Sequence, residues 1–346
     1  MQNAQGKVLR PHTVLELLDR TFNIYRDSFM KFVAPVAAVT VPITVITFLS
    51  SYALTNSLSA VRPGARNSAA TAAQLNQLMS GVLSSSLIVL GIVLILQFIQ
   101  IVIINSLLTY LASERHLGRS ATLGEAFAAV KSRFLSVGVG LLLFYILLGA
   151  LFFGLSFVFY CFGLAVPALI WLAVSLYAFL VPVLTLERTS ITEGMNRAWA
   201  LAKARFWPVF GFSAAVGFIY FLIYLTLSLT GTFLVRGTVT GASFGAGQIL
   251  ETLLQAIVTI FLAPILPIGY TVLYYDTRVR LEGLDIALDS LATPEPRPSD
   301  LVSPPPVGPT ITRTDVTNIF ILLAISILIV LLFVALSWLA LRGSRF

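Results

Sequence analysis

Seven long apolar runs limit what this chain can fold into more than any other feature of its sequence. An α-helix that crosses the hydrocarbon core of a bilayer needs about 20 apolar residues, and each run reaches that length. No Asp, Glu, Lys, Arg or His lies in the middle of any run. The pattern predicts an all-α, polytopic transmembrane helical bundle of about seven spans, near residues 32–54, 82–112, 134–158, 161–186, 207–235, 249–275 and 317–341.

The composition excludes most other classes of protein. Hydrophobic residues make up 58% of the 346 and charged residues only 11%, against about 25% charged in an ordinary soluble domain. These values exclude a soluble globular enzyme, a disordered chain and a coiled coil. The single cysteine, Cys161, excludes a disulfide framework and a thiolate metal cluster, and two histidines, His12 and His116, leave little for a metal site. We therefore expect no cofactor.

The basic residues are distributed unevenly between the two sides of the predicted bundle. Seventeen of the 22 Lys and Arg residues fall on the side that carries the N-terminus, and only Glu251 of the 15 acidic residues falls on the other. Because cytoplasmic loops collect Lys and Arg, this predicts a cytoplasmic N-terminus and an external C-terminus. The bias accounts for the net charge of +7 without a nucleic-acid partner. It fits a bacterial plasma (inner) membrane, although charge alone also fits a eukaryotic endomembrane.

Three cytoplasmic segments open with the same helix-start pattern. Each has Ser or Thr followed three residues later by Glu, the capping box in which the two side chains bond each other's backbone amides. Apolar residues then recur at helical spacing among Lys, Arg and aromatic residues, as in amphipathic helices on a membrane surface. In two of the segments a Glu stands four residues before an Arg, a spacing that predicts an ion pair within the helix. The boxes are Thr13–Glu16, Thr122–Glu125 and Ser190–Glu193, and the ion pairs are Glu16–Arg20 and Glu193–Arg197.

A pair of spans follows each of these surface helices, so the same unit occurs three times along the chain. We interpret the pattern as a threefold internal repeat. Since two spans preserve orientation, the units would be related by an axis along the membrane normal. The alternative is three membrane-entry helices that arose by convergence.

The chain changes character after the sixth span. A fourth cytoplasmic helix is predicted there, with two i,i+4 ion pairs and four leucines on one face. Residues 292–310 are rich in Pro and resemble an extended linker; a ligand for a reader of Pro-rich motifs is the alternative. We divide the chain into a six-span core at 1–291, a linker at 292–316 and a single transmembrane helix at 317–346. The pairs are Asp276–Arg280 and Arg278–Glu282, and the leucines are Leu281, Leu284, Leu288 and Leu291.

Three motifs carry a resemblance to a known family: LELLDRTF at 15–22, EGMNRAW at 193–199 and YYDTRVRLEGLD at 274–285. Together they resemble the glycerophosphoryl diester phosphodiesterase membrane-domain family over about residues 11–290. The resemblance implies a stand-alone bacterial membrane module. The catalytic barrel behind the family name resembles a TIM barrel of roughly 250 residues with a His-Arg-Gly start. Neither His12 nor His116 is followed by Arg, so phosphodiesterase activity is not expected.

Polar residues inside the spans form one candidate site. Gln97, Gln100 and Asn105 lie on roughly one side of the second span, and Gln255 and Glu251 lie one turn apart near the outer end of the sixth. They predict either a polar lining for a headgroup or solute, or hydrogen bonds between packed helices.

The sixth span and the loop before it carry further signals. Pro264 and Pro267 should kink the span and free backbone carbonyls, which makes either a hinge or a static kink. Glu251 is expected to pair with Arg236 across the short outer loop. Five glycines make 231–248 a flexible loop or, alternatively, a closely packed helix.

Basic residues on the cytoplasmic side form the second candidate site. They would bind anionic lipid headgroups or an acidic partner, or they serve only topology and i,i+4 pairing. The candidates are Arg20, Arg26, Arg197, Arg205, Arg278 and Arg280.

The sequence as a whole favours a non-catalytic integral membrane protein that assembles with other membrane proteins or with lipids. The alternative is a transporter or lipid-translocating permease. A membrane-embedded hydrolase has no nucleophile–base constellation in the sequence to support it.

Overall fold

The computed structural model describes residues 11–60, 69–159, 162–187, 189–238, 244–291, 297–301 and 311–343. Every regular element in these ranges is helical, so the predicted all-α fold is confirmed. The long helices are α2 (Phe29–Ala60), α3 (Ala69–His116), α5 (Phe134–Phe159), α9 (Phe206–Thr238), α10 (Phe244–Leu262), α11 (Ile265–Glu282) and α13 (Arg313–Gly343). The shorter ones are α1 (Val14–Asp27), α4 (Leu123–Val130), α6 (Phe162–Leu172), α7 (Ala178–Leu186), α8 (Ile191–Ala204) and α12 (Leu284–Asp289).

Seven helical segments are long and apolar enough to cross a membrane, as predicted. They are Phe29–Tyr52, Ser86–His116, Leu123–Ser156, Ala165–Leu186, Phe206–Leu227, Thr252–Glu282 and Arg313–Leu332. The protein is therefore a multi-pass membrane protein by length and composition of its helices.

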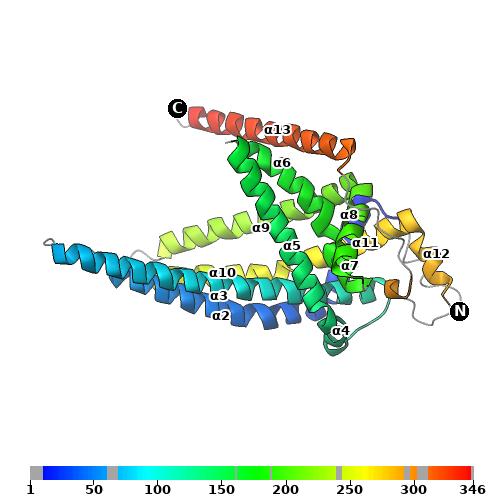
Figure 1. Cartoon of the computed structure of the whole chain (residues 1–346), viewed down its shortest axis with the longest axis horizontal. Coiled ribbons are helices and arrows are strands. Elements are labelled where there is room, and N and C mark those ends of the chain that lie inside the picture. Colours follow the sequence, from blue (N-terminus) through cyan, green and yellow to red (C-terminus); the bar gives the residue numbers. More distant parts are fainter. Residues whose placement is uncertain are drawn as a thin grey trace. The chain divides into compact units, whose positions relative to one another are not determined.

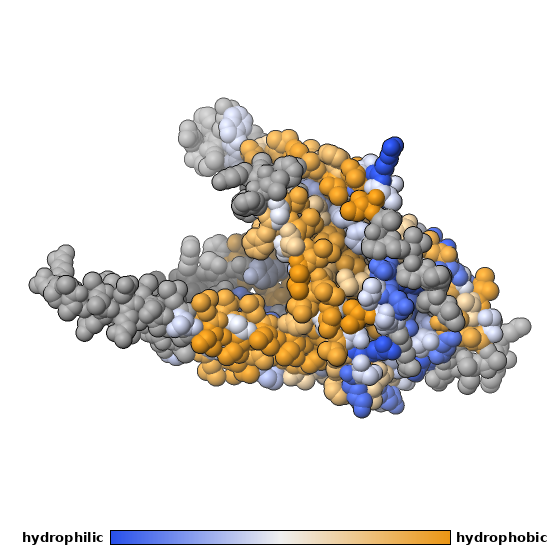
Figure 2. Space-filling view, in the orientation of Figure 1, coloured by the Kyte–Doolittle hydropathy of each residue, from blue (hydrophilic) through white to orange (hydrophobic). Residues whose placement is uncertain are grey.

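The chain divides into two compact units, which we describe separately. Unit 1 comprises Met1–Leu18, Val130–Ser213 and Tyr270–Phe346, and unit 2 comprises Asp19–Ala129 and Ala214–Gly269. In Figure 2, apolar surface covers α5 and α13 of unit 1, with hydrophilic residues near α8 and α11. In unit 2, apolar surface covers α2 and α3, with hydrophilic residues near α4.

Unit 1 is built around the fourth span. This span runs through α6, a π-helical segment Ala173–Tyr177 and α7, and 78% of it is buried, against 17–50% of the others. Helix α5 packs on α6 and α7, α8 packs on α7, and α13 packs along α6 (Figure 1). The central span thus receives three neighbouring helices of its own unit.

Two glycines allow the close approach of helices in unit 1. A Cβ atom on Gly194 of α8 or on Gly140 of α5 would overlap the side chain of Leu184 on α7. Leu184 itself is fully buried. A side chain at either position would force Leu184 to move, so glycine favours the close contact of α5 and α8 with α7.

Unit 2 is built around α2, which packs against both α3 and α10 (Figure 1). The rings of Phe29 and Phe261 stack with centroids 5.9 Å apart. Gln100 of α3 is buried and donates to Thr40 Oγ1 of α2 over 3.0 Å. This is the hydrogen bond between packed helices that one interpretation of Gln100 predicts.

The sixth span is broken, which confirms the effect predicted for its two prolines. Helix α10 ends at Leu262 and α11 begins at Ile265, because Pro264 and Pro267 have no N–H to donate to the preceding turn. The hydroxyl of Tyr25 donates to the Phe261 carbonyl over 2.7 Å. The hydroxyl of Tyr220 donates to the Leu262 carbonyl. Two carbonyls at the break are therefore satisfied by side chains from other helices.

All three predicted capping boxes form. Glu16, Glu125 and Glu193 each accept a hydrogen bond from the backbone amide of the Ser or Thr three residues earlier and donate their own amide to its hydroxyl. The helices α1, α4 and α8 begin at these boxes. The boxes explain where the helices start, whereas the threefold repeat stays a prediction.

Two local predictions are wrong, and one pair of alternatives is decided in part. The fourth cytoplasmic helix is not continuous, because Gly283 adopts a left-handed φ of +61° and separates α11 from α12. Leu284 and Leu288 are buried after this turn, but Leu281, before it, is exposed. The second wrong prediction is the Glu193–Arg197 ion pair, because Arg197 binds Glu187 and Glu282 instead. For 231–248 the helical alternative applies at both ends, since α9 continues to Thr238 and α10 begins at Phe244; residues 239–243 lie outside the described part of the structure.

Candidate functional site

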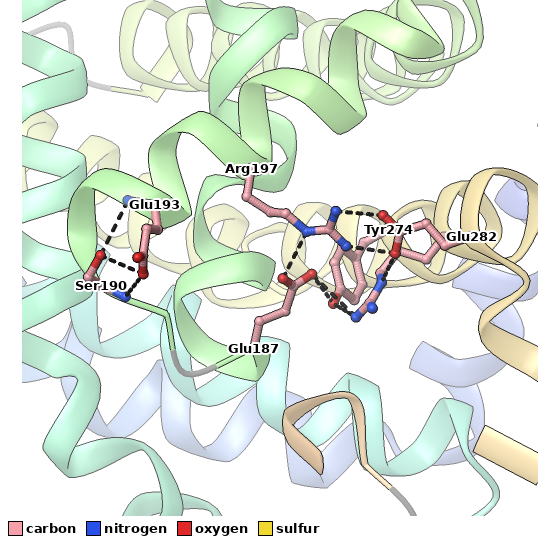
Figure 3. Close-up of polar contacts among 7 residues, drawn as sticks. Glu187, Ser190, Glu193, Arg197, Tyr274 and Glu282 are labelled. Carbon is pink, nitrogen blue, oxygen red and sulfur yellow. Dashed lines mark hydrogen bonds and ion pairs between the residues drawn. The ribbon is translucent and has the colours of Figure 1, made fainter. Parts of the chain in front are cut away.

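The most distinctive polar feature of the structure is a buried cluster of charges in unit 1, which we call the ionic junction. It consists of Glu187, Arg197, Tyr274, Arg278 and Glu282, which come from the end of α7, from α8 and from α11 (Figure 3). Tyr274, Arg278 and Glu282 are four residues apart and therefore share one face of α11. The capping box at Ser190 starts α8, and Arg197 follows Ser190 by about two helical turns.

Arg197 joins all three helices. Its Nη1 and Nη2 atoms each lie 2.6 Å from a different oxygen of Glu282, and its Nε donates to Glu187 Oε2 over 3.0 Å. A guanidinium that binds one carboxylate with two parallel bonds and a second with a third bond uses the full planar fork of arginine. Lysine cannot reproduce this geometry.

Arg278 completes the network from the other side. Its Nε donates to Glu282 Oε2 over 2.8 Å, and its Nη1 lies 2.8 Å from the Tyr274 hydroxyl and 3.3 Å from Glu187 Oε1. The Tyr274 hydroxyl in turn donates to Glu187 Oε1 over 2.8 Å. Glu187 and Glu282 therefore each touch both arginines, and the four charges of the ionic junction balance.

The ionic junction is withdrawn from solvent. Arg197 is 5% exposed and Arg278 2% exposed, and the Glu187 side chain is 0% exposed. Burial opposes the charge on Arg197, but the hydrogen bond and the charge of Glu282, together with the charge of Glu187, outweigh it and raise the pKa of Arg197 above its usual range. The guanidinium stays protonated, as arginine does throughout the physiological range.

A second ionic contact occupies the opposite face of the end of α11. Asp276 pairs with Arg205, which follows α8, and with Arg280 one turn later on α11. Asp276 Oδ1 also accepts from the His12 amide over 2.7 Å, and Arg280 Nη2 donates to the His12 carbonyl over 2.8 Å. The predicted pairs Asp276–Arg280 and Arg278–Glu282 are therefore both confirmed.

A third ionic contact links α8 to α13. Lys203 Nζ lies 2.5 Å from Asp315 Oδ2, and the two side chains are 15% and 3% exposed. The same ammonium lies 5.3 Å from the ring centroid of Trp199. Asp315 also accepts from the amide and the hydroxyl of Thr312, each over 2.7 Å, and so caps the start of α13. Helix α8 and the residue that follows it thus contact α7, α11 and α13 through three basic side chains, Arg197, Lys203 and Arg205.

The six arginines of the basic candidate site separate into two groups in the structure. Arg197, Arg205, Arg278 and Arg280 bind carboxylates of unit 1. Arg20 and Arg26 lie on α1, where Arg26 is exposed and Arg20 is partly buried. Four of the six charges are thus already neutralised within the protein.

The polar residues of the spans are not brought to one lining. Gln100 is directed to Thr40, Asn105 donates to the Ile101 carbonyl of its own helix over 2.8 Å, and Gln97 and Gln255 are exposed. The side chains of Glu251 and Arg236, and hence their predicted ion pair, lie outside the described part of the structure.

Several residues of these contacts carry little signal in the sequence. Glu187, Tyr274 and Lys203 are unremarkable singly, because their partners on other helices are distant along the chain. Asp315 alone carries a usable signal, since Thr312 and Asp315 repeat the capping pattern in front of an apolar run.

The chemistry open to the ionic junction follows from its pairing. Every oxygen of the Glu187 and Glu282 carboxylates already contacts Arg197, Arg278 or Tyr274. A general acid or base must instead have an oxygen within reach of a substrate. Among the described residues, no group of three or more His, Cys, Asp and Glu side chains is arranged to hold a metal ion. The arrangement is therefore suited to holding helices together.

Comparison with known proteins adds no relative. No family model, no curated protein and no solved structure matches the chain.

Proposed function

We propose that this protein is a non-catalytic integral membrane module that assembles with other membrane proteins or with lipids, in a bacterial plasma membrane with its N-terminus in the cytoplasm. One observation carries the proposal: the basic residues Arg197, Lys203, Arg205, Arg278 and Arg280 are all paired with carboxylates of the same unit. The ionic junction, the Asp276 contact and the Lys203–Asp315 pair fix α7, α8, α11 and α13, and they leave no carboxylate of the junction free to act on a substrate.

The surface of the spans supports the same proposal. In the second, fifth and seventh spans, only 17% of the most apolar stretch is buried within the chain. In a bilayer these faces contact lipids or the helices of a partner. The seventh span is the clearest candidate, because the residues Ile327–Leu332 are all about half or more exposed and its start is held by one ion pair.

The proposal is tested by removing residues 292–346. We expect the truncated protein to lose or weaken a co-purifying partner while the six remaining spans stay folded. The measurement is native mass spectrometry after mild extraction, compared with the full chain, with circular dichroism as the check on folding. A truncated protein that keeps every partner in full stoichiometry would overturn the assembly role of the seventh span.

A permease is the second candidate, favoured by the broken sixth span, since interrupted helices form the substrate sites of many transporters. Against it stands the satisfaction of the Phe261 and Leu262 carbonyls by tyrosine hydroxyls. Flux of labelled lipid in proteoliposomes that exceeds protein-free vesicles would support the permease. If the flux does not exceed that of protein-free vesicles, the non-catalytic membrane module remains the proposed function.

We also propose that the chain is related to the glycerophosphoryl diester phosphodiesterase membrane-domain family. Its motifs at 193–199 and 274–285 include Arg197, Tyr274, Arg278 and Glu282 of the ionic junction. We infer that the motifs serve to build this contact, which is consistent with a membrane module that needs no phosphodiesterase barrel.

A further inference from the structure

The contact between α8 and α13 contains more hydrogen-bond donors than acceptors. The indole rings of Trp171 and Trp199 meet edge to face with centroids 5.3 Å apart, and Lys203 lies over Trp199. The Nε1 atoms of both tryptophans are buried without a hydrogen-bond partner, and Trp171 as a whole is only 5% exposed. Buried indole N–H groups ordinarily find an acceptor, so this cluster lacks one.

The acceptor that is present comes from a separate part of the chain. Asp315 gives its carboxylate to Lys203, and α13, which carries Asp315, follows the Pro-rich residues 292–310. Asp315 is also bonded to Thr312, so its carboxylate would keep hydrogen-bond partners if it left Lys203. Lys203, which lies over the Trp199 ring, is therefore paired with a carboxylate that a different anion could replace.

The position of the cluster between two span ends indicates which kind of anion it would bind. Helix α8 begins five residues after the fourth span ends at Leu186 and stops just before the fifth span begins at Phe206. An amphipathic helix between two span ends lies at the level of the lipid headgroups. Tryptophan and lysine are the side chains that favour this level, and a lipid phosphate accepts hydrogen bonds from both.

We propose that Lys203, together with the indole N–H group of Trp199, binds the phosphate of an anionic phospholipid, and that Asp315 competes with this phosphate for Lys203. When the phosphate binds, the start of α13 loses its ionic contact with α8. Lipid composition would then regulate how firmly the seventh span is held. The inference rests on the proposed association with lipids, but it does not require a protein partner.

The test compares occupancy by phosphatidylglycerol, phosphatidylcholine and inorganic phosphate, measured by native mass spectrometry of the full chain in detergent. We expect Asp315→Asn to bind phosphatidylglycerol at least threefold more tightly than the unmodified protein, because the competing charge is gone. Adding Lys203→Gln to Asp315→Asn should abolish this gain. Lys131→Gln, which removes an exposed lysine of the same unit, is the matched control and should leave binding unchanged.

A second variant keeps the ion pair intact. Trp199→Phe retains an aromatic ring under Lys203 but removes one N–H donor, so binding of phosphatidylglycerol should weaken two- to fivefold with no change in thermal stability. Equal binding of phosphatidylglycerol by the unmodified protein, Asp315→Asn and the double variant would overturn the proposal. Occupancy by inorganic phosphate equal to that by lipid would overturn the lipid as the source and uphold the phosphate chemistry. Truncation at residue 291 tests the assembly role separately, because it reports on proteins rather than on headgroups.

Discussion

Unit 1 joins its helices through charged side chains, whereas unit 2 joins its helices through neutral hydrogen bonds and apolar contacts. In unit 1, Arg197 reaches two carboxylates on two other helices while remaining buried. In unit 2, Gln100 reaches Thr40 and Tyr220 reaches the Leu262 carbonyl. Two ion pairs also lie in unit 2: Arg115–Asp27 is about half exposed, and Arg119–Glu114, 12% and 6% exposed, joins residues only five apart in the chain.

This difference between the units predicts which single substitutions will lower stability most. A buried charge that loses its partner costs far more than a neutral group that loses one hydrogen bond. Unit 1 should therefore depend steeply on a few residues, and unit 2 should spread its stability over many small contacts. The following variants test this contrast in order of decreasing effect.

Removal of Arg197 should have the largest effect. Arg197→Met leaves Glu187 and Glu282 buried with one arginine between them, and such an unbalanced charge costs about 3–5 kcal/mol. The measurement is the free energy of unfolding in mixed micelles. Arg26→Met, on the exposed face of α1, is the matched control and should change it little.

A second substitution, combined with Arg197→Met, distinguishes the effect of charge balance on stability from the effect of packing. Adding Glu282→Gln to Arg197→Met restores the balance between Glu187 and Arg278, so part of the lost stability should return. If the double variant is less stable than Arg197→Met alone, the charges of the ionic junction are not what holds it.

The second variant tests close packing in unit 1. Gly194→Ala places a methyl group on Leu184 and should cost about 1–3 kcal/mol, the usual range for an overpacked core. Gly211→Ala on α9 meets no atom within 4 Å and should be neutral or slightly stabilising, because alanine favours helix. The cost of Gly194→Ala should shrink when Leu184→Ala makes room, and equal costs with and without Leu184 would contradict the packing argument.

The third variant moves to the broken span of unit 2. Tyr220→Phe leaves the Leu262 carbonyl without its hydroxyl donor, and we expect a loss of about 1–2 kcal/mol. Tyr224→Phe, one turn along α9 and exposed, serves as control in the same thermal unfolding experiment. A loss as large as that of Arg197→Met would mean that the two units do not differ in the way proposed.

The smallest effect is expected for the hydrogen bond between α2 and α3. Gln100→Leu removes the bond to Thr40, and bonds of this kind between membrane helices average about 0.6 kcal/mol. Gln97→Leu, at an exposed position of the same helix, should change stability less. If Gln97→Leu is the more damaging, Gln97 rather than Gln100 makes the important contact in the folded protein.

The sequence predicted most of the local structure because that structure depends on neighbours in the chain. Seven apolar runs predict seven spans, and the Ser/Thr-x-x-Glu pattern predicts where α1, α4 and α8 begin. Two prolines three residues apart predict the break in the sixth span. Each feature follows from hydrogen bonding or burial within a single helix.

The candidate site was predicted only in part. Arg197, Arg205, Arg278 and Arg280 were identified by their charge, but their partners were not, except where the partner stood four residues away. The pair Glu193–Arg197 shows the limit: Glu193 caps its helix and Arg197 turns to Glu187 and Glu282 instead. A capping contact and a bidentate buried pair together win over an exposed i,i+4 pair, which is worth only a few tenths of a kcal/mol.

The sequence by itself determined that this chain is a helical multi-pass membrane protein, because the length and polarity of each run decide whether it can cross a bilayer. Only the tertiary structure decided which charges meet. Arg197 and Glu282 are 85 positions apart, and Lys203 and Asp315 are 112 positions apart. A long-range ion pair depends on how helices pack, and packing depends on shape, as at Gly194 and Leu184, which no local pattern of residues records.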